Sequence, residues 1–434
     1  MSRHLRVESL QTLVVGSGPA GIAAAVCAAE NGARVGLVDD NPHAGGQIWH
    51  SSAKYSAHSG EESRWRSRLM ASIIQLQGWS VFDQPSPGVL RAERPDAVAD
   101  LHYENLILAT GARERFLPFP GWTLPNVLGA GALQAMVKSG LPIAGKRVVI
   151  AGTGPLLLAV AAFLKSAGAV ALCVCEQSPF VRLLRFAFAL ASDPGKLGDG
   201  LRYKTTCWNV PFHTSTWPIE ASGDRALHSV TLSVRGKTRR VECDYLACGF
   251  HLVPNIELPT LLGCRIENGA VRVNQWQQTS KPGIYCAGEP TGIGGLELSL
   301  IEGQIAGLVA AGKLEKARSL FGRRSKLARF AASLAQAFTL RAELKSLPQD
   351  TTLLCRCEDV PYGVVRQHRS WRSAKLHTRC GMGPCQGRIC GAATEFLLGW
   401  TANSIRPPVF PALISSLAAS QDGHGRDLEA IHNI

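Results

Sequence analysis

Near its start the 434-residue chain reads Leu13-Val14-Val15-Gly16-Ser17-Gly18-Pro19-Ala20-Gly21, an apolar run followed by a glycine-rich turn. An alanine-rich segment over residues 22–30 and a second apolar run over residues 35–38 come next. The apolar runs predict strands and the alanine-rich segment predicts a helix, so the whole reads as a βαβ unit. A G-x-G-x-x-G turn in that position is typical of units that bind a dinucleotide.

The residues of this turn have separate roles. Gly16 permits the tight turn, Gly18 lets the backbone approach a pyrophosphate, and Gly21 lets helix and strand pack closely. The helix N-terminus then offers unpaired N–H groups to the phosphates. Asp39, followed by Asp40, comes 18 positions after Gly21, close to the spacing of a carboxylate that binds the adenosine ribose. The alternative is a glycine turn in an α/β domain that binds no nucleotide. The presence of both strands, the helix and the terminal Asp together disfavours this alternative.

Three further segments resemble those of flavoproteins with two dinucleotide-binding domains and favour FAD over NAD. Residues 42–47 look like their P-x-x-G-G-Q loop, and residues 106–112 resemble their apolar strand ending in A-T-G. Residues 283–289 resemble the strand whose terminal G-D holds the ribityl chain, with Glu289 in place of the Asp. Gly292, Gly294 and Gly295 then precede a helix expected over residues 296–311.

These segments together give the candidate residues for binding FAD. They are Gly16, Gly18, Pro19, Ala20, Gly21, Asp39, Asp40, Gly46, Gln47, Ala109, Thr110, Gly111, Gly288, Glu289, Gly294 and Gly295. No base or nucleophile stands out, so the catalytic residues are unknown. His43, His50 and His58 lie near the flavin loop, where structural or solvated histidines are the commoner case.

A second unit of the same kind begins about 135 residues after the first. A strand over residues 147–150 leads to the turn 151–157, a helix to residue 167 and a strand ending at Glu176. In flavin reductases the second copy binds NAD(P)H, and Glu176 suits a ribose 2′-OH. Leu157, however, stands in place of the third glycine. We expect a packing domain or one for another nucleotide, with an NADH site as the alternative. Two cysteines on the second strand are expected in the core: Cys173 and Cys175.

Five of the thirteen cysteines lie between residues 355 and 390. They include a C-x-C pair and a C-x4-C pair, and four such ligands can hold zinc or an iron–sulfur cluster. No C-x-x-C occurs, which argues against a thioredoxin-type reductase. The spacing matches neither common zinc fingers nor the usual ferredoxins. A disulfide or free-thiol interpretation is the less favoured alternative.

The cysteine-rich tail resembles the small [2Fe–2S] domain of bacterioferritin-associated ferredoxin. Residues 378–390 match the pattern T-R-x-G-M-G-x-C-Q-G-x-x-C that ends the flavoprotein subunits of some dehydrogenases. The resemblance implies four metal ligands, Cys355, Cys357, Cys385 and Cys390. Cys380 falls at the variable position and is left outside, although Cys380 and Cys385 also have x4 spacing.

Nearly the whole chain resembles one family. Residues 111–122 look like its G-A-x-E-R-x-x-P-F-P-G-W segment, and residues 243–258 resemble its return to the FAD domain. The family consists of the α (A) subunits of heteromeric FAD-dependent dehydrogenases, including opine oxidase, D-hydroxyproline dehydrogenase and hydrogen cyanide synthase. It implies an FAD-containing β subunit that oxidises an amino acid or opine, and often a small ferredoxin-like γ subunit. The α subunit would pass electrons between FAD and a [2Fe–2S] cluster.

The expected fold is therefore α/β, a Rossmann-like flavoprotein with two dinucleotide-binding domains and a small helical C-terminal [2Fe–2S] domain. The FAD-binding domain is expected over residues 1–113 and 245–320, with the second nucleotide-binding-like domain at 114–244. A basic linker helix at 321–345 and the [2Fe–2S] domain and tail at 346–434 complete the chain.

Composition narrows the remaining function classes. Hydrophobic residues make up 46% and charged residues 18%, which excludes a disordered chain. The net charge of +13 suggests nucleic-acid binding as one hypothesis. The basic stretch around Arg323-Arg324, however, also contains apolar residues at helical spacing. This pattern predicts an amphipathic helix that packs against a partner, and it disfavours nucleic-acid binding.

The start lacks an apolar signal core, so no secretory signal is expected. Lys165 and Gly168 interrupt the longest apolar stretch, so no membrane span is expected. We expect a cytoplasmic protein, with peripheral contact to a respiratory acceptor at the membrane's inner face as a further option. A self-contained NADH-dependent flavin reductase feeding the cluster is the rival function.

Overall fold

The computed structural model describes residues 3–49, 60–69, 72–190, 207–401 and 405–418. The chain divides into two compact units. Unit 1 comprises residues 1–113, 254–331 and 404–434, and unit 2 comprises residues 114–253 and 332–403. Both units are therefore discontinuous in sequence. The chain passes from unit 1 to unit 2 in β7 (Ala112–Glu114) and returns to unit 1 in β16 (Leu252–Pro254).

Unit 1 is built on a seven-stranded sheet. Its order is β3-β2-β1-β6-β5-β4, with β19 also paired to β6. The strands β1, β2, β3, β6 and β19 pair in parallel, whereas β4, β5 and β6 form an antiparallel ribbon. The bounds are β1 (Arg3–Val15), β2 (Val35–Asp39), β3 (Ile74–Gln77), β4 (Ser80–Ser86), β5 (Val89–Arg94), β6 (Ala97–Leu108) and β19 (Ile284–Cys286).

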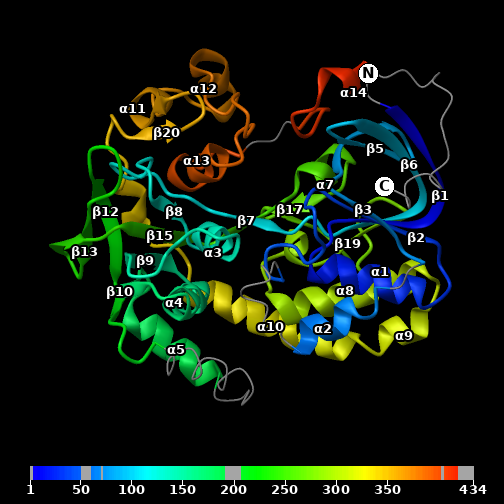
Figure 1. Ribbon diagram of the computed structural model, residues 1–434, viewed down its shortest axis with the longest axis horizontal. Coiled ribbons are helices and arrows are strands. Elements are labelled where there is room, and N and C mark those ends of the chain that lie inside the picture. Colours follow the sequence, from blue (N-terminus) through cyan, green and yellow to red (C-terminus); the bar gives the residue numbers. More distant parts are fainter. Residues whose placement is uncertain (1–2, 50–59, 70–71, 191–206, 402–404, 419–434) are drawn as a thin grey trace. The chain divides into compact units, whose positions relative to one another are not determined.

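Two helices of unit 1 lie side by side against this sheet, α1 (Pro19–Ala29) and α8 (Leu296–Ala310) (Figure 1). A Cβ atom on Gly303 would lie 2.1 Å from the Ala20 carbonyl oxygen, and one on Gly307 would lie 2.2 Å from that of Ala24. The helices can approach this closely only because both positions are glycine. Their facing residues form one continuous core.

The remaining elements of unit 1 are short. They are α2 (Gly60–Arg66), α7 (Glu257–Leu261), β17 (Ile266–Glu267), β18 (Ala270–Val271), η1 (Glu289–Thr291), α9 (Leu314–Arg318) and α14 (Ile414–Leu417).

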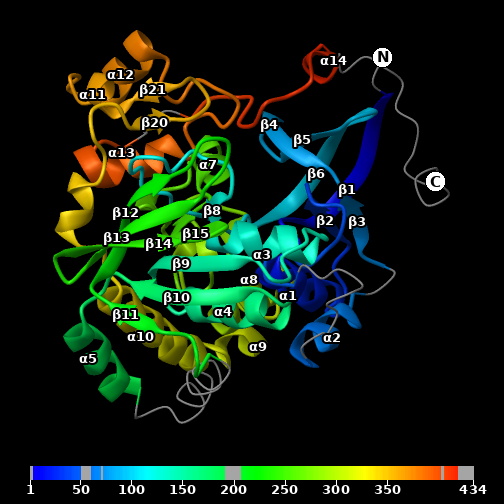
Figure 2. The same ribbon diagram turned by 60° about the vertical axis from the view of Figure 1, so that its left-hand side comes forward.

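Unit 2 carries a five-stranded parallel sheet in the order β11-β10-β9-β15-β8 and a three-stranded antiparallel sheet, β12-β13-β14 (Figure 2). The parallel strands are β8 (Val127–Gly129), β9 (Arg147–Thr153), β10 (Val170–Glu176), β11 (Phe212–Thr214) and β15 (Tyr245–Phe250). The antiparallel strands are β12 (Thr216–Ser222), β13 (Ser229–Val234) and β14 (Lys237–Glu242), and the helices are α3 (Ala130–Lys138), α4 (Leu156–Ser166) and α5 (Phe180–Leu190). The longest apolar stretch thus becomes a helix and a strand, as expected.

The cysteine-rich segment belongs to unit 2 and has a small core of its own. Its elements are η2 (Ala342–Ser346), β20 (Leu353–Cys355), β21 (Val360–Pro361), α11 (Tyr362–Val365), α12 (Trp371–Thr378) and α13 (Cys390–Leu398). The expected α/β flavoprotein fold with a small helical C-terminal region is therefore confirmed.

The basic linker forms one long helix, α10 (Phe321–Ala337). Leu327 and Ala331 are buried in the core of unit 1, and Arg324 pairs with Glu302 of α8 at 3.0 Å. The expected amphipathic helix is confirmed, and Leu327 and Ala331 pack on the chain itself; contact of this helix with a partner stays a prediction. Throughout the described residues, helices fall short of the length and apolarity needed to cross a bilayer.

Candidate functional site

The first glycine turn is as tight as its pattern predicts. Gly16 has a φ of +101°, and a Cβ atom there would lie 2.2 Å from the carbonyl oxygen of Ala109. A Cβ atom on Gly21 would lie 1.7 Å from the carbonyl oxygen of Gly16. At Gly18, by contrast, a Cβ atom would meet no heavy atom within 4 Å. The turn is thus closed against strand and helix but open at the α1 N-terminus, where a ligand's pyrophosphate would approach.

The first turns of α1 are buried. Pro19 occupies the first helical position, where its missing N–H costs nothing. Ala20 is 7% exposed and packs below Gly288, whose Cβ atom would lie 2.8 Å from that of Ala20. Gly288 has a φ of +80°, so a side chain there would be strained as well. Residues 19–20 and 288 therefore meet beside the open end of the turn.

Asp39 ends β2 and binds the turn directly. Its Oδ2 atom accepts a hydrogen bond from the Ser17 backbone N–H at 2.5 Å, and its Oδ1 atom accepts one from that of Asn41 at 2.8 Å. The side chain is 8% exposed, whereas Asp40 is exposed. Asp39 therefore holds the turn in shape at the position where a ribose would lie.

The loop over residues 42–47 lies against the same turn. The Gly45 backbone N–H donates to the Ser17 carbonyl at 2.8 Å, and a Cβ atom on Gly46 would lie 2.9 Å from the Cα atom of Gly18. Gln47 and His43 are exposed. The other two histidines of the sequence analysis, His50 and His58, lie outside the described residues.

Asn255 clamps the strand-end residues 109–111. Its Nδ2 group donates to the Thr110 carbonyl and its carbonyl accepts from Thr110 Oγ1, both at 2.8 Å. Its backbone N–H donates to the Gly111 carbonyl at 3.0 Å. Ala109 is held by β1, because its N–H donates to the Val15 carbonyl at 2.8 Å. The A-T-G segment is therefore rigid beside the glycine turn.

Glu289 bonds to the residues that precede α8. Its carboxylate accepts hydrogen bonds from the backbone N–H groups of Gly295 at 2.9 Å and Gly294 at 3.3 Å. Burial raises the pKa of this carboxyl group to about 7. The longer side chain, which replaces the Asp of the resembling family, thus reaches the glycine N–H groups at the start of the helix.

A buried ion pair, Glu302 with Arg324, holds the loop over residues 288–291 by hydrogen bonds, and the sequence analysis missed it. Glu302 is 2% exposed and accepts hydrogen bonds from the Gly288 N–H at 3.1 Å and from Thr291 Oγ1 at 2.9 Å. It also accepts one from Arg324 Nε at 3.1 Å. A glutamate in the middle of the apolar α8 sequence was the available signal, because buried carboxylates are usually paired.

The described residues of this site fit FAD. Three of their features point to a dinucleotide: an open approach over Gly18, backbone that leaves no room for side chains, and a free helix N-terminus. Gly46, Thr110 and Glu289 would lie toward the flavin half of such a ligand, and Asp39 toward its adenosine half.

The second turn has the same backbone pattern but different packing. Gly152 has a φ of +142° and a Cβ atom there would lie 2.0 Å from the Gly249 carbonyl oxygen. Leu157, in place of the third glycine, is 1% exposed, and its Cδ2 atom lies 3.4 Å from where a Cβ atom of Gly249 would be. The Glu176 carboxylate accepts three hydrogen bonds of 2.8 Å, from Thr153 Oγ1 and from the backbone N–H groups of Gly154 and Ser178. Cys173 and Cys175 are buried on the neighbouring strand.

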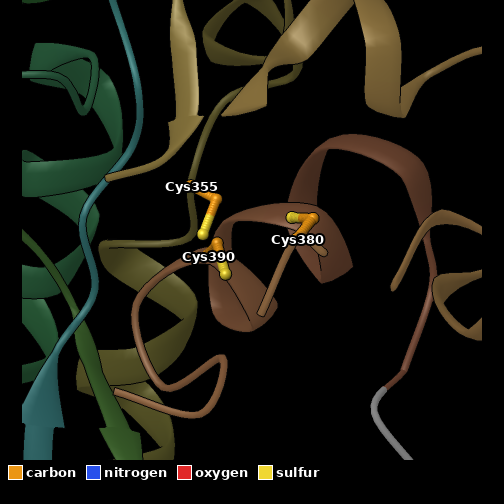
Figure 3. A group of neighbouring side chains, drawn as sticks. All are labelled: Cys355, Cys380 and Cys390. Atoms are coloured by element: carbon orange, nitrogen blue, oxygen red, sulfur yellow. The ribbon is translucent and has the colours of Figure 1, made fainter. Parts of the chain in front are cut away.

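Three cysteines of unit 2 converge on one point (Figure 3). The Sγ atoms of Cys355, Cys380 and Cys390 all lie within 4.8 Å of one another, and all three side chains are buried. Cys355 ends β20, Cys380 follows α12, and Cys390 begins α13. The Gly381 N–H donates to Cys355 Sγ at 3.5 Å, which favours a thiolate there. The sequence pattern left Cys380 outside the ligand set, but its Sγ atom lies as close to those of Cys355 and Cys390 as a fellow metal ligand would.

The other two cysteines extend this group toward the surface. Cys385 is partly exposed and Cys357 is exposed, and the pKa of Cys385 responds to Cys390 and Cys357 as neighbours. Interactions with neighbouring thiols lower the pKa of Cys355 and Cys385 and raise the pKa of Cys380 and Cys390, so the group shares its protons and Cys355 and Cys385 hold the negative charge. Thiolates are the form that binds metal, and an all-thiol set suits zinc or an iron–sulfur cluster. These five residues, 355, 357, 380, 385 and 390, are called the cysteine cluster below.

Known proteins resemble this chain over most of its length. Residues 10–312 match the family described as pyridine nucleotide-disulphide oxidoreductase. The chain is 32% identical to hydrogen cyanide synthase subunit HcnB of Pseudomonas aeruginosa, covering 88% of this chain and 91% of that protein. It is 30% identical to the A subunit of opine oxidase from Rhizobium meliloti, covering 94% and 98%.

Solved structures agree on the fold. L-proline dehydrogenase from P. horikoshii superposes with a TM-score of 0.66 at 18% identity, covering 96% of this chain and 81% of that one. Thioredoxin reductase from T. acidophilum superposes with a TM-score of 0.52 at 21% identity, covering 73% and 98%.

Proposed function

Because the chain belongs to the pyridine nucleotide-disulphide oxidoreductase family, with HcnB and the opine oxidase A subunit as relatives, we propose that it is an electron-transfer subunit. Its complex would be a heteromeric dehydrogenase that oxidises the C–N bond of an amino acid or opine, such as D-hydroxyproline or glycine. The single observation that carries this proposal is a cysteine cluster in a chain that also has an FAD-type site.

The proposed chemistry combines two cofactors. FAD exchanges two electrons at once or singly, and a [2Fe–2S] cluster exchanges one, so the pair converts between two-electron and one-electron transfer. Cys355, Cys357, Cys385 and Cys390 would hold the irons. Cys380 would be an additional buried thiol beside the cluster, and zinc is the outcome that the metal analysis must exclude.

The chain's own residues would prepare both sites. The α1 N-terminus and the turn at Gly18 would bind the pyrophosphate, and Asp39 would orient the turn. Glycine backbone next to the thiolates, as at Gly381, would donate N–H groups to sulfur. Such donors favour added negative charge, and therefore the reduced state of a cluster.

The relatives' names support a partner. HcnB and its opine oxidase counterpart are each named as one subunit of an enzyme. We propose an FAD-containing β subunit that binds the amine and, as a further component, a small ferredoxin-like γ subunit. In a cytoplasmic complex of this kind, electrons would leave to a respiratory acceptor at the inner face of the membrane.

Reconstitution tests the division of labour. The isolated chain is expected to bind FAD and iron but to show no flavin reduction by opines, D-hydroxyproline or glycine. Adding the second FAD-bearing subunit is expected to give dehydrogenase activity. Anaerobic flavin bleaching by such a substrate in the isolated chain would contradict the proposal.

Single Cys→Ser variants test the ligand set. Iron and sulfide analysis, with electron paramagnetic resonance after dithionite, is expected to show two irons lost for Cys355→Ser and Cys385→Ser. Cys207→Ser, at a buried cysteine of the same unit, is the matched control and should keep both irons. If Cys380→Ser loses the signal while Cys385→Ser keeps it, the ligand set is wrong. Zinc without iron after anaerobic purification would make the cluster structural.

A further inference from the structure

In unit 2, a segment from the end of α10 crosses the sheet edge where a nucleotide would bind. The segment comprises residues 337–341 and is called the closing segment here. Parallel sheets bind ligands at the carboxyl ends of their strands. Those ends are Thr153 in β9, residues 177–178 after β10, and His251 after β15. Each of the three strand ends has a polar atom within 3.3 Å of the closing segment.

The bonds start beside the glycine turn. Thr153 Oγ1 lies 3.3 Å from the Phe338 carbonyl oxygen, and Ser178 Oγ donates to the Ala337 carbonyl at 3.2 Å. The His251 Nε2 atom lies 2.6 Å from the same Phe338 carbonyl oxygen. These residues occupy the positions from which a Rossmann-type unit contacts adenosine and pyrophosphate.

Gln177 contacts the closing segment with both the nitrogen and the oxygen of its side-chain amide. Its Nε2 group lies 3.3 Å from the Thr339 carbonyl oxygen, and its Oε1 atom accepts from the Arg341 backbone N–H at 3.1 Å. Arg182 also donates to the Thr339 carbonyl, at 3.2 Å. The closing segment thus pairs with Gln177 through two consecutive peptide groups.

The closing segment also fills space. Phe338 is 7% exposed, and its ring meets that of Phe186 edge-on at a centroid distance of 5.7 Å. The Glu176 carboxylate already binds its own turn, as described above. An incoming ribose would therefore meet a buried aromatic side chain and a carboxylate that has three donors.

Beyond this edge the chain leads to the cysteine cluster. Arg341 lies over the Trp217 ring at 5.0 Å, and Leu344 is fully buried in the core of unit 2. Residues 342–346 then form η2, which precedes β20 and Cys355. Anchoring of the closing segment therefore also positions the start of the cysteine-rich segment on unit 2.

We propose that the closing segment is the resident occupant of the second dinucleotide crevice, and that this crevice anchors the chain leading to the cysteine cluster and takes no NADH or NADPH. The inference goes beyond the proposed function, since it concerns another site. It also removes the rival function, because an NADH-dependent flavin reductase needs this crevice free.

Direct binding tests the first half of the proposal. The full FAD-loaded chain is titrated anaerobically with NADH and NADPH, while nicotinamide fluorescence and flavin absorbance are followed. We expect no saturable binding and no flavin bleaching up to about 1 mM of either. Saturable binding of NADH in that range, competed by ADP-ribose, overturns the proposal. The outcome does not depend on a β subunit or on iron, so it is distinguishable from failure of the proposed function.

Hydrogen exchange tests the anchoring. In Gln177→Ala, the Arg341 amide loses its acceptor, and we expect it to exchange at least ~10-fold faster. Gln367→Ala, at an exposed glutamine of the same unit, is the matched control and should leave that amide unchanged. Unchanged protection in Gln177→Ala overturns the anchoring role. If Gln177→Ala does not fold, Phe338→Ala is measured in its place, with the same expected loss of protection at residues 337–341.

Discussion

The two dinucleotide folds of this chain have similar backbones and different surroundings. A Cβ atom built on Gly18 in unit 1, or on Gly154 at the matching position of unit 2, would meet no heavy atom within 4 Å. In unit 2 the closing segment lies over the corresponding strand ends. The comparison teaches that a βαβ unit specifies an edge where ligands bind, and that the rest of the chain decides whether the edge is available.

The carboxylates at the two strand ends do not make this difference. Asp39 accepts from the Ser17 N–H of its own turn, and Glu176 accepts from the Gly154 N–H of its own turn. Both therefore stabilise a turn whether or not a ligand is present. What separates the second fold from the first is Leu157, in place of Gly21, together with the closing segment.

The largest expected effect is loss of FAD from the first fold. Gly18→Val places side-chain atoms in the open approach, so the protein should fold but purify without flavin colour. Absorbance at the flavin bands, with the FAD-to-protein ratio, measures the effect. Gly154→Ala is the matched change in the second fold; it adds backbone strain at a φ of +98° but should leave the FAD content unchanged. Full flavin stoichiometry in Gly18→Val would break the comparison.

A second contrast uses the buried carboxylates. Glu302→Ala removes the partner of Arg324 and the acceptor of Gly288 and Thr291, so we expect a loss of about 3–5 kcal/mol in the free energy of unfolding. Urea denaturation of the FAD-loaded protein measures it. Glu176→Ala leaves neutral donors unpaired and should cost about 1–3 kcal/mol, with FAD binding intact. Equal losses in both variants would contradict the stronger role of the ion pair.

The pH dependence of stability tests the first fold through Glu289. Burial raises the pKa of Glu289 to about 7 from an ordinary value of 4.5, so the folded protein retains a proton that the unfolded chain releases. Its contribution to stability is therefore present below pH 4.5 and is lost as the pH rises to 7, by up to about 3 kcal/mol. Glu289→Gln should remove this slope.

Denaturation midpoints at pH 5 and pH 8 give the measurement for Glu289. The stability of Glu289→Gln relative to wild type should increase between the two values. Glu104→Gln, at an exposed glutamate of unit 1, is the control and should show no such increase. A difference that stays constant with pH would show that the carboxyl group is ionised in the folded protein at pH 5.

The smallest expected effect is on cofactor affinity at the adenosine end. Asp39→Ala should weaken FAD by about 1.5–3 kcal/mol, since it removes one charge-assisted ribose contact and the acceptor of Ser17. Fluorescence titration of the FAD-free protein gives the dissociation constant. An unchanged constant would mean that Asp39 serves the turn alone, as Glu176 does in the second fold.

Local patterns predicted much of this molecule. The turn at Gly16, the strand ending at Asp39 and the helix over residues 296–310 depend on spacing within a few residues, which sequence shows directly. The Glu302–Arg324 pair and the contact of Gln177 with Arg341 join residues 22 and 164 positions apart. Nothing in the local pattern encodes such pairs, because they arise from how the elements pack. The same limit applies to the close approach of Cys380 to Cys355.

The interrupted layout of the two units has a consequence for synthesis on the ribosome. When residue 253 leaves the ribosome, unit 1 still lacks β19 and α8, and unit 2 still lacks the closing segment. The apolar face of α1 that α8 later covers is then open to solvent and to other nascent chains. Neither unit can be completed before residue 310 is made, so the two mature almost together and late. Until residue 310 is made, α8 cannot cover that apolar face of α1.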